Sequence, residues 1–207
     1  MKNKFKIFII LILNFTLINF SAYSKEIDFK AIEILAYDKD NIIIGEGKAE
    51  AKIDGEIEIY ADKITYDKND ETVLAEGKVL VLDLINEIKI NSTKIIYYKE
   101  KKLITSYNKT SFNIKEKYKV NSTDVTFNIA ADTIYSNDKT FLIDDIDNEI
   151  SLSSFKFSNK SEILDGKNIE IKDNDQNRYF LSEGILRLND YALLGKDIKV
   201  LLRKDIY

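Results

Sequence analysis

The feature that most constrains the fold is a ten-residue pattern that returns about every thirty residues. Apolar residues alternate on both sides of a small residue, and the alternation slips once at that residue. An alternation with one slip is what a bent or bulged β-strand requires. A period of this length predicts stacked supersecondary units that bury their apolar faces against one another. The copies are residues 57–66 (IEIYADKITY), 88–97 (IKINSTKIIY) and 118–127 (YKVNSTDVTF).

A second, glycine-marked element interleaves with the first. Residues 43–49 (IIGEGKA) match residues 73–79 (VLAEGKV), and residues 181–185 (LSEGI) are similar to both. Residues 164–171 match residues 193–200, so the repeat reaches the C-terminus although it blurs between residues 103 and 159. Strand patterns are nearly continuous, and helical periodicity is hard to find after the N-terminal segment. The predicted polar turns are residues 38–41, 54–55, 67–70, 99–102, 136–139 and 173–177. The sequence therefore predicts an all-β array.

The N-terminus is typical of a secretory signal peptide. A basic start is followed by a mostly apolar run over residues 7–20 and an Ala-x-Ser exit at Ala22 and Ser24. A retained membrane anchor is the alternative, but the run is shorter than the roughly 20 residues that a spanning helix needs. We expect residues 1–24 to be removed on export, leaving residues 25–207 as one array.

Composition gives little sign of catalysis. The chain has no Cys and no His, so zinc sites and Ser-His or Cys-His pairs are excluded. A formal net charge of −4 offers no basic surplus for nucleic acid. Residues 173–184 begin like a calcium loop, but Arg178 and Gly184 replace the Gly and Glu that such a loop needs. We expect no enzyme activity, no cofactor and no metal.

Two of the repeated segments carry a family resemblance. Residues 61–67 (ADKITYD), a short gap, and residues 73–79 (VLAEGKV) resemble the OstA-like repeat of the lipopolysaccharide transport proteins. The match is good across residues 42–98, degenerate to about residue 159, and recognisable again in pieces from residue 163. Within this family the chain looks most like the N-terminal periplasmic domain of the LptD members, the LPS-assembly proteins. The LptA and LptC members share the fold.

The resemblance implies an OstA/LptA-like β-jellyroll, a V of two antiparallel sheets around an apolar interior. It implies a periplasmic protein associated with the outer membrane, which binds the acyl chains of lipopolysaccharide and docks end to end with other Lpt jellyrolls by strand addition. LptD members also carry an outer-membrane barrel, which 207 residues cannot hold. The chain is then a fragment that ends before such a barrel, or a stand-alone bridge protein of the LptA or LptC type. A secreted structural β-repeat or adhesin remains a further alternative.

Alternation along each predicted strand places every second residue inside the V. The same residues are equally consistent with an ordinary β-sandwich core, and a register error would exchange Val79 and Val81 for Leu80 and Leu82. We expect the docking edge at residues 32–36 or 42–49, because an unpaired edge strand accepts a further strand. The candidates for the lipid groove are Ile57, Ile59, Ile64, Tyr66, Val79, Val81, Ile88, Ile90, Ile95, Tyr97, Tyr118, Val120, Val125 and Phe127.

Overall fold

A computed structural model describes residues 27–203 of the chain. The predicted signal peptide, residues 1–24, lies outside the described residues, as do residues 25–26 and 204–207. Every regular element between residues 27 and 203 is a β-strand, which confirms the all-β prediction there. Over the same range there is no helix of the length and hydropathy that a membrane span requires.

Short turns and bends connect the strands in sequence. Their bounds are β1 (Ile27–Lys30), β2 (Glu33–Tyr37), β3 (Ile42–Ile53), β4 (Ile57–Asp67), β5 (Thr72–Asp83), β6 (Ile88–Tyr98), β7 (Leu103–Tyr107), β8 (Lys109–Ile114), β9 (Tyr118–Thr123), β10 (Thr126–Asn128), β11 (Thr133–Ser136), β12 (Thr140–Ile143), β13 (Glu149–Leu152), β14 (Ser154–Ser158), β15 (Ile163–Lys172), β16 (Arg178–Arg187), β17 (Ala192–Lys196) and β18 (Lys199–Leu201).

The strands build two antiparallel walls that share one bent line, which we call the crease. Six long strands, β3 to β6 together with β15 and β16, run through the crease and belong to both walls. The β2 wall pairs in the order β2, β3, β4, β5, β6, β7, β10, β11, β14, β15, β16, β17. The β1 wall pairs in the order β1, β3, β4, β5, β6, β8, β9, β12, β13, β15, β16, β18.

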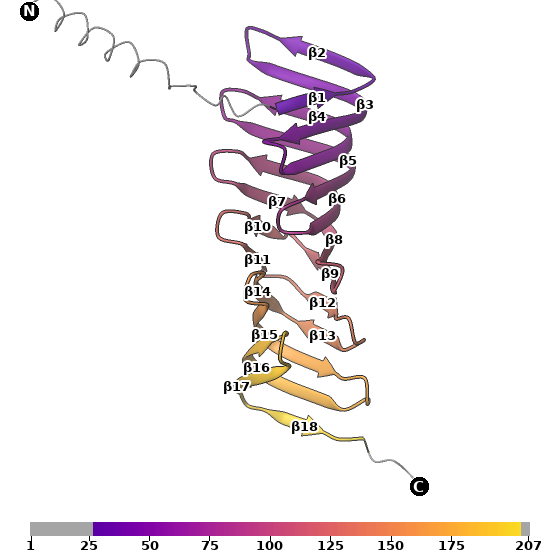
Figure 1. Ribbon diagram of the computed structural model, residues 1–207, viewed down its shortest axis with the longest axis vertical. Coiled ribbons are helices and arrows are strands. Elements are labelled where there is room, and N and C mark those ends of the chain that lie inside the picture. The colour runs from indigo at the N-terminus through magenta and orange to yellow at the C-terminus, as the bar shows by residue number, and fades with distance from the viewer. Residues whose placement is uncertain (1–26, 204–207) are drawn as a thin grey trace, which may run out of the picture.

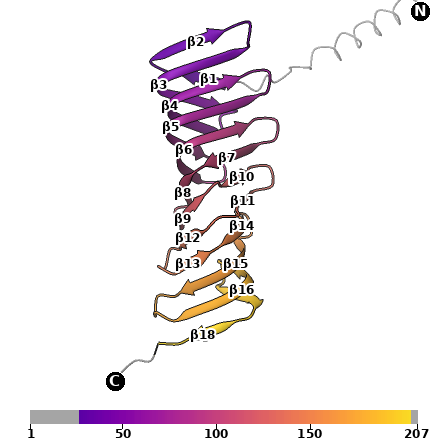
Figure 2. The ribbon, with the colours of Figure 1, turned by 180° about the vertical axis from the view of Figure 1, so that it is seen from behind.

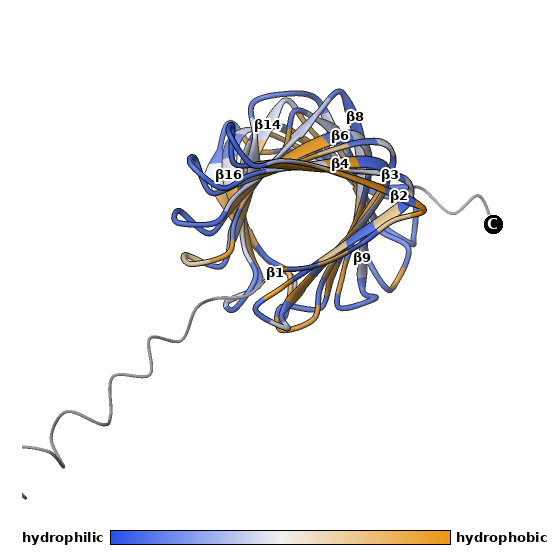
Figure 3. Ribbon diagram, turned by 90° about the horizontal axis from the view of Figure 1, so that it is seen from above, coloured by the Kyte–Doolittle hydropathy of each residue, from blue (hydrophilic) through white to orange (hydrophobic). Residues whose placement is uncertain are grey.

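Each passage of the chain across both walls is one layer, and each layer pairs with the layer before and the layer after it. The result is an elongated stack with β1 and β2 at one end and β18 at the other (Figures 1 and 2). Seen along the stack, the two walls bend around a common interior (Figure 3). Two layers complete one repeat, since β3 begins at Ile42 and β5 begins thirty residues later at Thr72. The predicted V of antiparallel sheets with a period of about thirty residues is confirmed.

The repeat motif itself builds the crease between β4 and β5. The register shifts between Tyr60 and Lys63 on β4, so the predicted slip in the alternation is a β-bulge. Gly77 lies opposite this bulge with a φ of 99°, and a Cβ there would overlap the side chain of Asp62. The Asp62 carboxylate accepts the backbone N–H of Lys78 at 3.1 Å. Asp62 therefore satisfies a backbone N–H at the bend, and Gly77 provides the backbone conformation that the same bend requires.

In the middle of the stack, where the sequence repeat is degenerate, side-chain hydroxyl groups stabilise the bend at the crease. Ser106 Oγ donates to the carbonyl of Val125 at 3.1 Å and accepts the N–H of Val125 at the same distance. Thr110 Oγ1 donates to Ser106 Oγ at 2.8 Å. Residues 136–139, one of the predicted polar turns, form a bend of the crease between β11 and β12, and these two strands do not pair with each other. Ser136 Oγ donates to the Thr123 carbonyl of the neighbouring layer at 2.7 Å.

Both ends of the stack present free strand edges. Between residues 27 and 203, β1 and β2 pair only with β3, while β17 and β18 pair only with β16. Apolar side chains are exposed at each end, including Ile34 and Leu35 at one and Leu194 and Val200 at the other. The expected edge at residues 32–36 coincides with β2. The alternative at residues 42–49 is wrong, because β3 has paired neighbours on both sides.

Candidate functional site

The interior between the walls is the candidate site, and it contains the predicted groove residues. All fourteen except Tyr66 are buried there, each at most 7% exposed, and Tyr66 is half-buried against them. Val79 and Val81 point inward, whereas Leu80 and Leu82 are only half-buried. The structure thus selects the first of the two registers. Contact of these residues with a lipid stays a prediction.

Aromatic side chains fill the middle of the interior and join the two walls. Phe112 on β8 of the β1 wall meets Phe127 on β10 of the β2 wall edge-on, with ring centroids 5.2 Å apart. Phe112 also stacks on Phe155 of β14, with ring centroids 6.4 Å apart. One layer further, Tyr118 on β9 contacts Phe157 on β14, with ring centroids 5.8 Å apart. Each of these pairs crosses from one wall to the other, so the walls are held together at this level.

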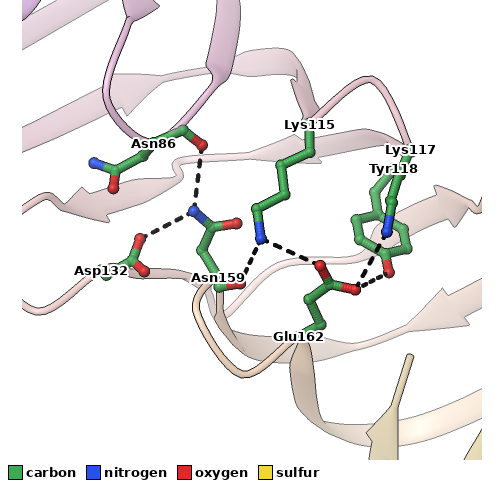
Figure 4. A network of polar contacts seen from close by, with 7 residues as sticks. All are labelled: Asn86, Lys115, Lys117, Tyr118, Asp132, Asn159 and Glu162. Carbon is green, nitrogen blue, oxygen red and sulfur yellow. Dashed lines mark hydrogen bonds and ion pairs between the residues drawn. The ribbon is translucent and has the colours of Figure 1, made fainter. Parts of the chain in front are cut away.

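The turns of the two walls approach one another opposite the crease, along a line that we call the mouth. A polar cluster joins the walls here, centred on Glu162 of the β2 wall (Figure 4). The Glu162 carboxylate accepts from Lys115 Nζ at 3.2 Å and from the Tyr118 hydroxyl at 2.8 Å, and Lys117 Nζ lies 3.9 Å away. These three partners belong to the β1 wall. We call this cluster, together with Asn86, Asp132 and Asn159, the clasp.

Asn159 extends the clasp along the mouth. Its side-chain nitrogen donates to the Asn86 carbonyl of the β1 wall at 3.3 Å and to Asp132 Oδ1 at 3.1 Å. Its backbone carbonyl accepts from Lys115 Nζ at 3.2 Å. The side chain is 3% exposed, and its Oδ1 has no hydrogen-bond partner among residues 27–203. A second ion pair, Lys102–Glu56 at 3.9 Å, crosses the mouth nearer the N-terminus.

Protonation of the Glu162 carboxylate should weaken the clasp. Burial pushes the pKa of this carboxyl upward, but hydrogen bonds from Tyr118 and Lys115 and the charges of Lys117 and Lys115 outweigh burial, so the pKa lies below its usual 4.5. Burial and the hydrogen bond to Glu162 raise the pKa of Tyr118 in turn. Since the folded state lowers the pKa of Glu162, its contribution to stability is complete above about pH 4.5 and is lost as pH falls through the lowered pKa.

We therefore expect Glu162→Gln to lower the free energy of unfolding by about 1–2 kcal/mol at pH 7, because a charge-assisted hydrogen-bond network is lost. The difference from wild type should shrink as pH falls below 4.5. Urea denaturation between pH 3 and pH 8 measures it. Glu149→Gln is the matched control, since Glu149 makes a single, partly exposed ion pair with Lys172 and should change stability by less than about 1 kcal/mol. A difference for Glu162→Gln that grows toward low pH would contradict the prediction.

A cavity of about 360 Å³ opens at the mouth near the C-terminal end of the stack. The turns at residues 144–148 and 173–177 of the β1 wall and at 188–191 of the β2 wall surround it. Ile150, Leu186 and Leu188 form buried parts of its wall. Sequence reasoning missed these residues, although the repeat at residues 164–171 and 193–200 already indicated further layers with the same inward alternation. A second cavity, of about 10 Å³, lies beside Asn86 and Asp132 of the clasp.

The interior between the walls is lined by apolar side chains. Between residues 27 and 203 no group of three or more His, Cys, Asp or Glu side chains is placed to hold a metal ion. Burial raises the pKa of Tyr97 to about 12, with the nearby charges of Asp54 and Glu56 adding to the effect, so this interior phenol stays neutral at physiological pH. The carboxylates of Asp144 and Asp173 accept hydrogen bonds from their own turns. The arrangement can exclude water from an apolar ligand.

Comparison with known sequences found no match, whereas comparison with solved structures found several. No family model matches the sequence, and no curated protein matches it. The fold is similar to the crystal structure of LptH, the LptA homologous periplasmic component of the conserved lipopolysaccharide transport device from Pseudomonas aeruginosa. The two share 10% identity with a TM-score of 0.29, over 87% of this chain and 96% of that chain.

Proposed function

We propose that this chain is a periplasmic lipid carrier of the lipopolysaccharide transport type, which shields acyl chains between its two walls. The observation that carries the proposal is a single apolar interior that continues from layer to layer between two free ends. The OstA-like motif supports it, because its residues Asp62 and Gly77 build the crease on which the two-walled shape depends.

The physical need for such a shape is clear. An acyl chain in water costs about 0.8 kcal/mol for each exposed methylene group, so a carrier must cover the chain along its length. Inward residues of successive layers supply that cover. Because these residues are buried against one another, the two walls must separate at the mouth when a chain enters. The clasp at Glu162 opposes that separation, so it opens and closes in each cycle of binding.

The free ends serve association with like domains. An unpaired edge strand has backbone donors and acceptors that a further strand can satisfy, and stacking one more array extends the apolar interior. Within this proposal we assign the chain to the periplasmic part of an LptD-type assembly protein, exported and associated with the outer membrane, where a barrel follows. A stand-alone bridge of the LptA or LptC type fits the same geometry. A purely structural β-repeat would not bind lipid.

Locking the mouth provides the test. The chain has no cysteine, so a Lys115→Cys, Glu162→Cys variant carries a unique pair of thiols on opposite walls, and a short bis-maleimide can join them. The open variant should bind a fluorescent lipid A analogue. The cross-linked variant should bind it at least about tenfold more weakly, a loss of roughly 1.4 kcal/mol, because the walls can no longer part.

The same variant treated with a mono-maleimide is the control for chemical modification. Equal binding by the cross-linked and control samples would show that lipid does not enter between the walls. Absence of binding in wild type and in every variant would reject the lipid-carrier function and favour the structural β-repeat.

A further inference from the structure

The cavity near the C-terminal end differs from the rest of the mouth in its charge. The three turns around it, residues 144–148, 173–177 and 188–191, contain six Asp and no Lys or Arg. The clasp, by contrast, carries charges of both signs, with Lys115 and Lys117 bound to Glu162. The mouth is therefore mixed and paired in charge in its middle and acidic at its C-terminal end.

Three of the basic residues that flank the cavity are already paired with a carboxylate. Arg187 pairs with Asp190 at 3.1 Å, Lys172 with Glu149 at 3.3 Å, and Arg178 with Glu170 at 3.7 Å. Arg203 lies beside the second turn, where its backbone N–H donates to Asn177 Oδ1 at 3.0 Å. Five carboxylates take part in none of the salt bridges formed between residues 27 and 203. They are Asp144, Asp145, Asp147, Asp173 and Asp175.

Below this acidic rim the cavity is apolar. Ile150, Leu186 and Leu188 are at most 5% exposed, and Ile171 and Leu193 pack against them. Its volume of about 360 Å³ is at the lower end of the roughly 300–1,000 Å³ range of ligand pockets. That size suits one alkyl chain and not the several chains of a whole lipid anchor. An alkyl chain in this cavity would leave its polar end at the rim, among the carboxylates.

We infer that the C-terminal cavity is a binding site for a single alkyl chain that ends in a positively charged amine. Low-dielectric walls concentrate the field of the rim on the polar end of the ligand. An ammonium group is attracted there, a hydroxyl group is tolerated, and a phosphate is repelled. The inference rests on the proposed lipid-carrier function and adds to it a selection by head group, since a phosphate-bearing head must stay away from this end of the mouth.

Three ligands with the same ten-carbon chain test the inference: decylammonium, decanol and decyl phosphate. Each is used to displace the neutral dye N-phenyl-1-naphthylamine at pH 7.5, where the amine remains charged because its pKa resembles that of lysine, about 10.4. We expect decylammonium to compete at least about tenfold better than decyl phosphate, with decanol between them. The preference should fade as ionic strength rises from about 0.01 M to about 1 M, as the Debye length shortens from roughly 30 Å to 3 Å.

Two variants separate the rim from the cavity. The double substitution Asp145→Asn, Asp175→Asn removes two exposed rim charges, and it should reduce the preference for decylammonium while decanol binds as before. Asp165→Asn, an exposed position on β15 outside the cavity, is the matched control and should leave the preference intact. Leu193→Trp fills the cavity and should weaken all three ligands, provided that its circular dichroism spectrum matches that of wild type.

Decyl phosphate competing as well as decylammonium would overturn the inference, as would a preference that the Asp145→Asn, Asp175→Asn variant shows undiminished. If Leu193→Trp does not fold, the three-ligand series on wild type still decides the question. The cross-linked clasp variant distinguishes this inference from the proposed function. It should still take decylammonium into the C-terminal cavity even where it no longer binds the lipid A analogue, and loss of both would reject the separate site.

Discussion

Replacing Phe112 with alanine should lower the free energy of unfolding by about 3–5 kcal/mol, the range for removing a buried aromatic side chain. Phe112 is 1% exposed and contacts Phe127 and Phe155 of the opposite wall. Aromatic pairs add about 0.5–1.5 kcal/mol each beyond the area that they bury. The substitution removes both pairs at once and leaves a void where the walls meet. Urea denaturation followed by circular dichroism measures the change.

Tyr135 provides the control for this experiment, because its side chain is 38% exposed on β11. Tyr135→Ala should cost less than about 1 kcal/mol, as is usual for an exposed position. A loss below about 1.5 kcal/mol for Phe112→Ala would contradict the close packing of the walls. It would mean that the interior relaxes around the missing ring, and the mouth would then open at little cost.

Replacing Ala36 with proline should abolish association through the β2 edge with little loss of stability. The Lys68 N–H donates to the Asn41 carbonyl at 2.9 Å, so that carbonyl points toward β4, and the N–H of Ile42 on the same peptide plane points toward β2. Because bonded residues alternate along an antiparallel pair, Leu35 points its N–H toward β3 and Ala36 points its N–H outward. Proline at position 36 removes an outward donor only. We expect association of copies of the chain, measured by sedimentation equilibrium, to weaken at least about tenfold, roughly 1.4 kcal/mol.

Leu35→Pro is the matched variant one position along the strand. It removes a bond to β3, so it should destabilise the β2–β3 pair, which Ala36→Pro leaves intact. Unchanged association of Ala36→Pro would show that the β2 edge does not accept a second strand. Wild-type protein that stays monomeric at high concentration would show that copies of this chain are not partners for that edge.

Much of the fold follows from local patterns in the sequence. Alternation across residues 57–66 predicts both the inward face of β4 and the bulge at its centre, because side-chain direction in a strand depends only on position. The middle of the stack was harder to predict. There, Ser106 and Ser136 hold the bend where Asp62 and Gly77 do so earlier, and a hydroxyl that bonds a backbone carbonyl leaves no distinctive motif. For the same reason the sequence predicts residues 136–139 only as a polar turn and does not distinguish a crease from a hairpin.

The inward residues of the site could be predicted from the sequence, whereas the contacts across its mouth could not. Tyr118 and Val120 follow from alternation alone. The clasp joins turns that lie 44 residues apart, as between Lys115 or Tyr118 and groups at positions 159 and 162, and no local pattern encodes such a pairing. The C-terminal cavity depends likewise on how three separate turns are spaced across the mouth. Such contacts depend on the twist and stacking of the walls. All copies of the repeat together determine that geometry, and no single copy does so alone.

The strictly sequential pairing of layers has a consequence for how such a molecule changes in length. Since each layer pairs with its immediate neighbours, stability behaves as a sum of nearest-neighbour couplings along a line. Duplicating or deleting two layers, about thirty residues, preserves the hand of every hairpin and adds or removes one unit without disturbing the rest. The same linearity allows the terminal layers to fray independently of the middle, so the ends can remodel for a neighbour while the aromatic centre stays folded.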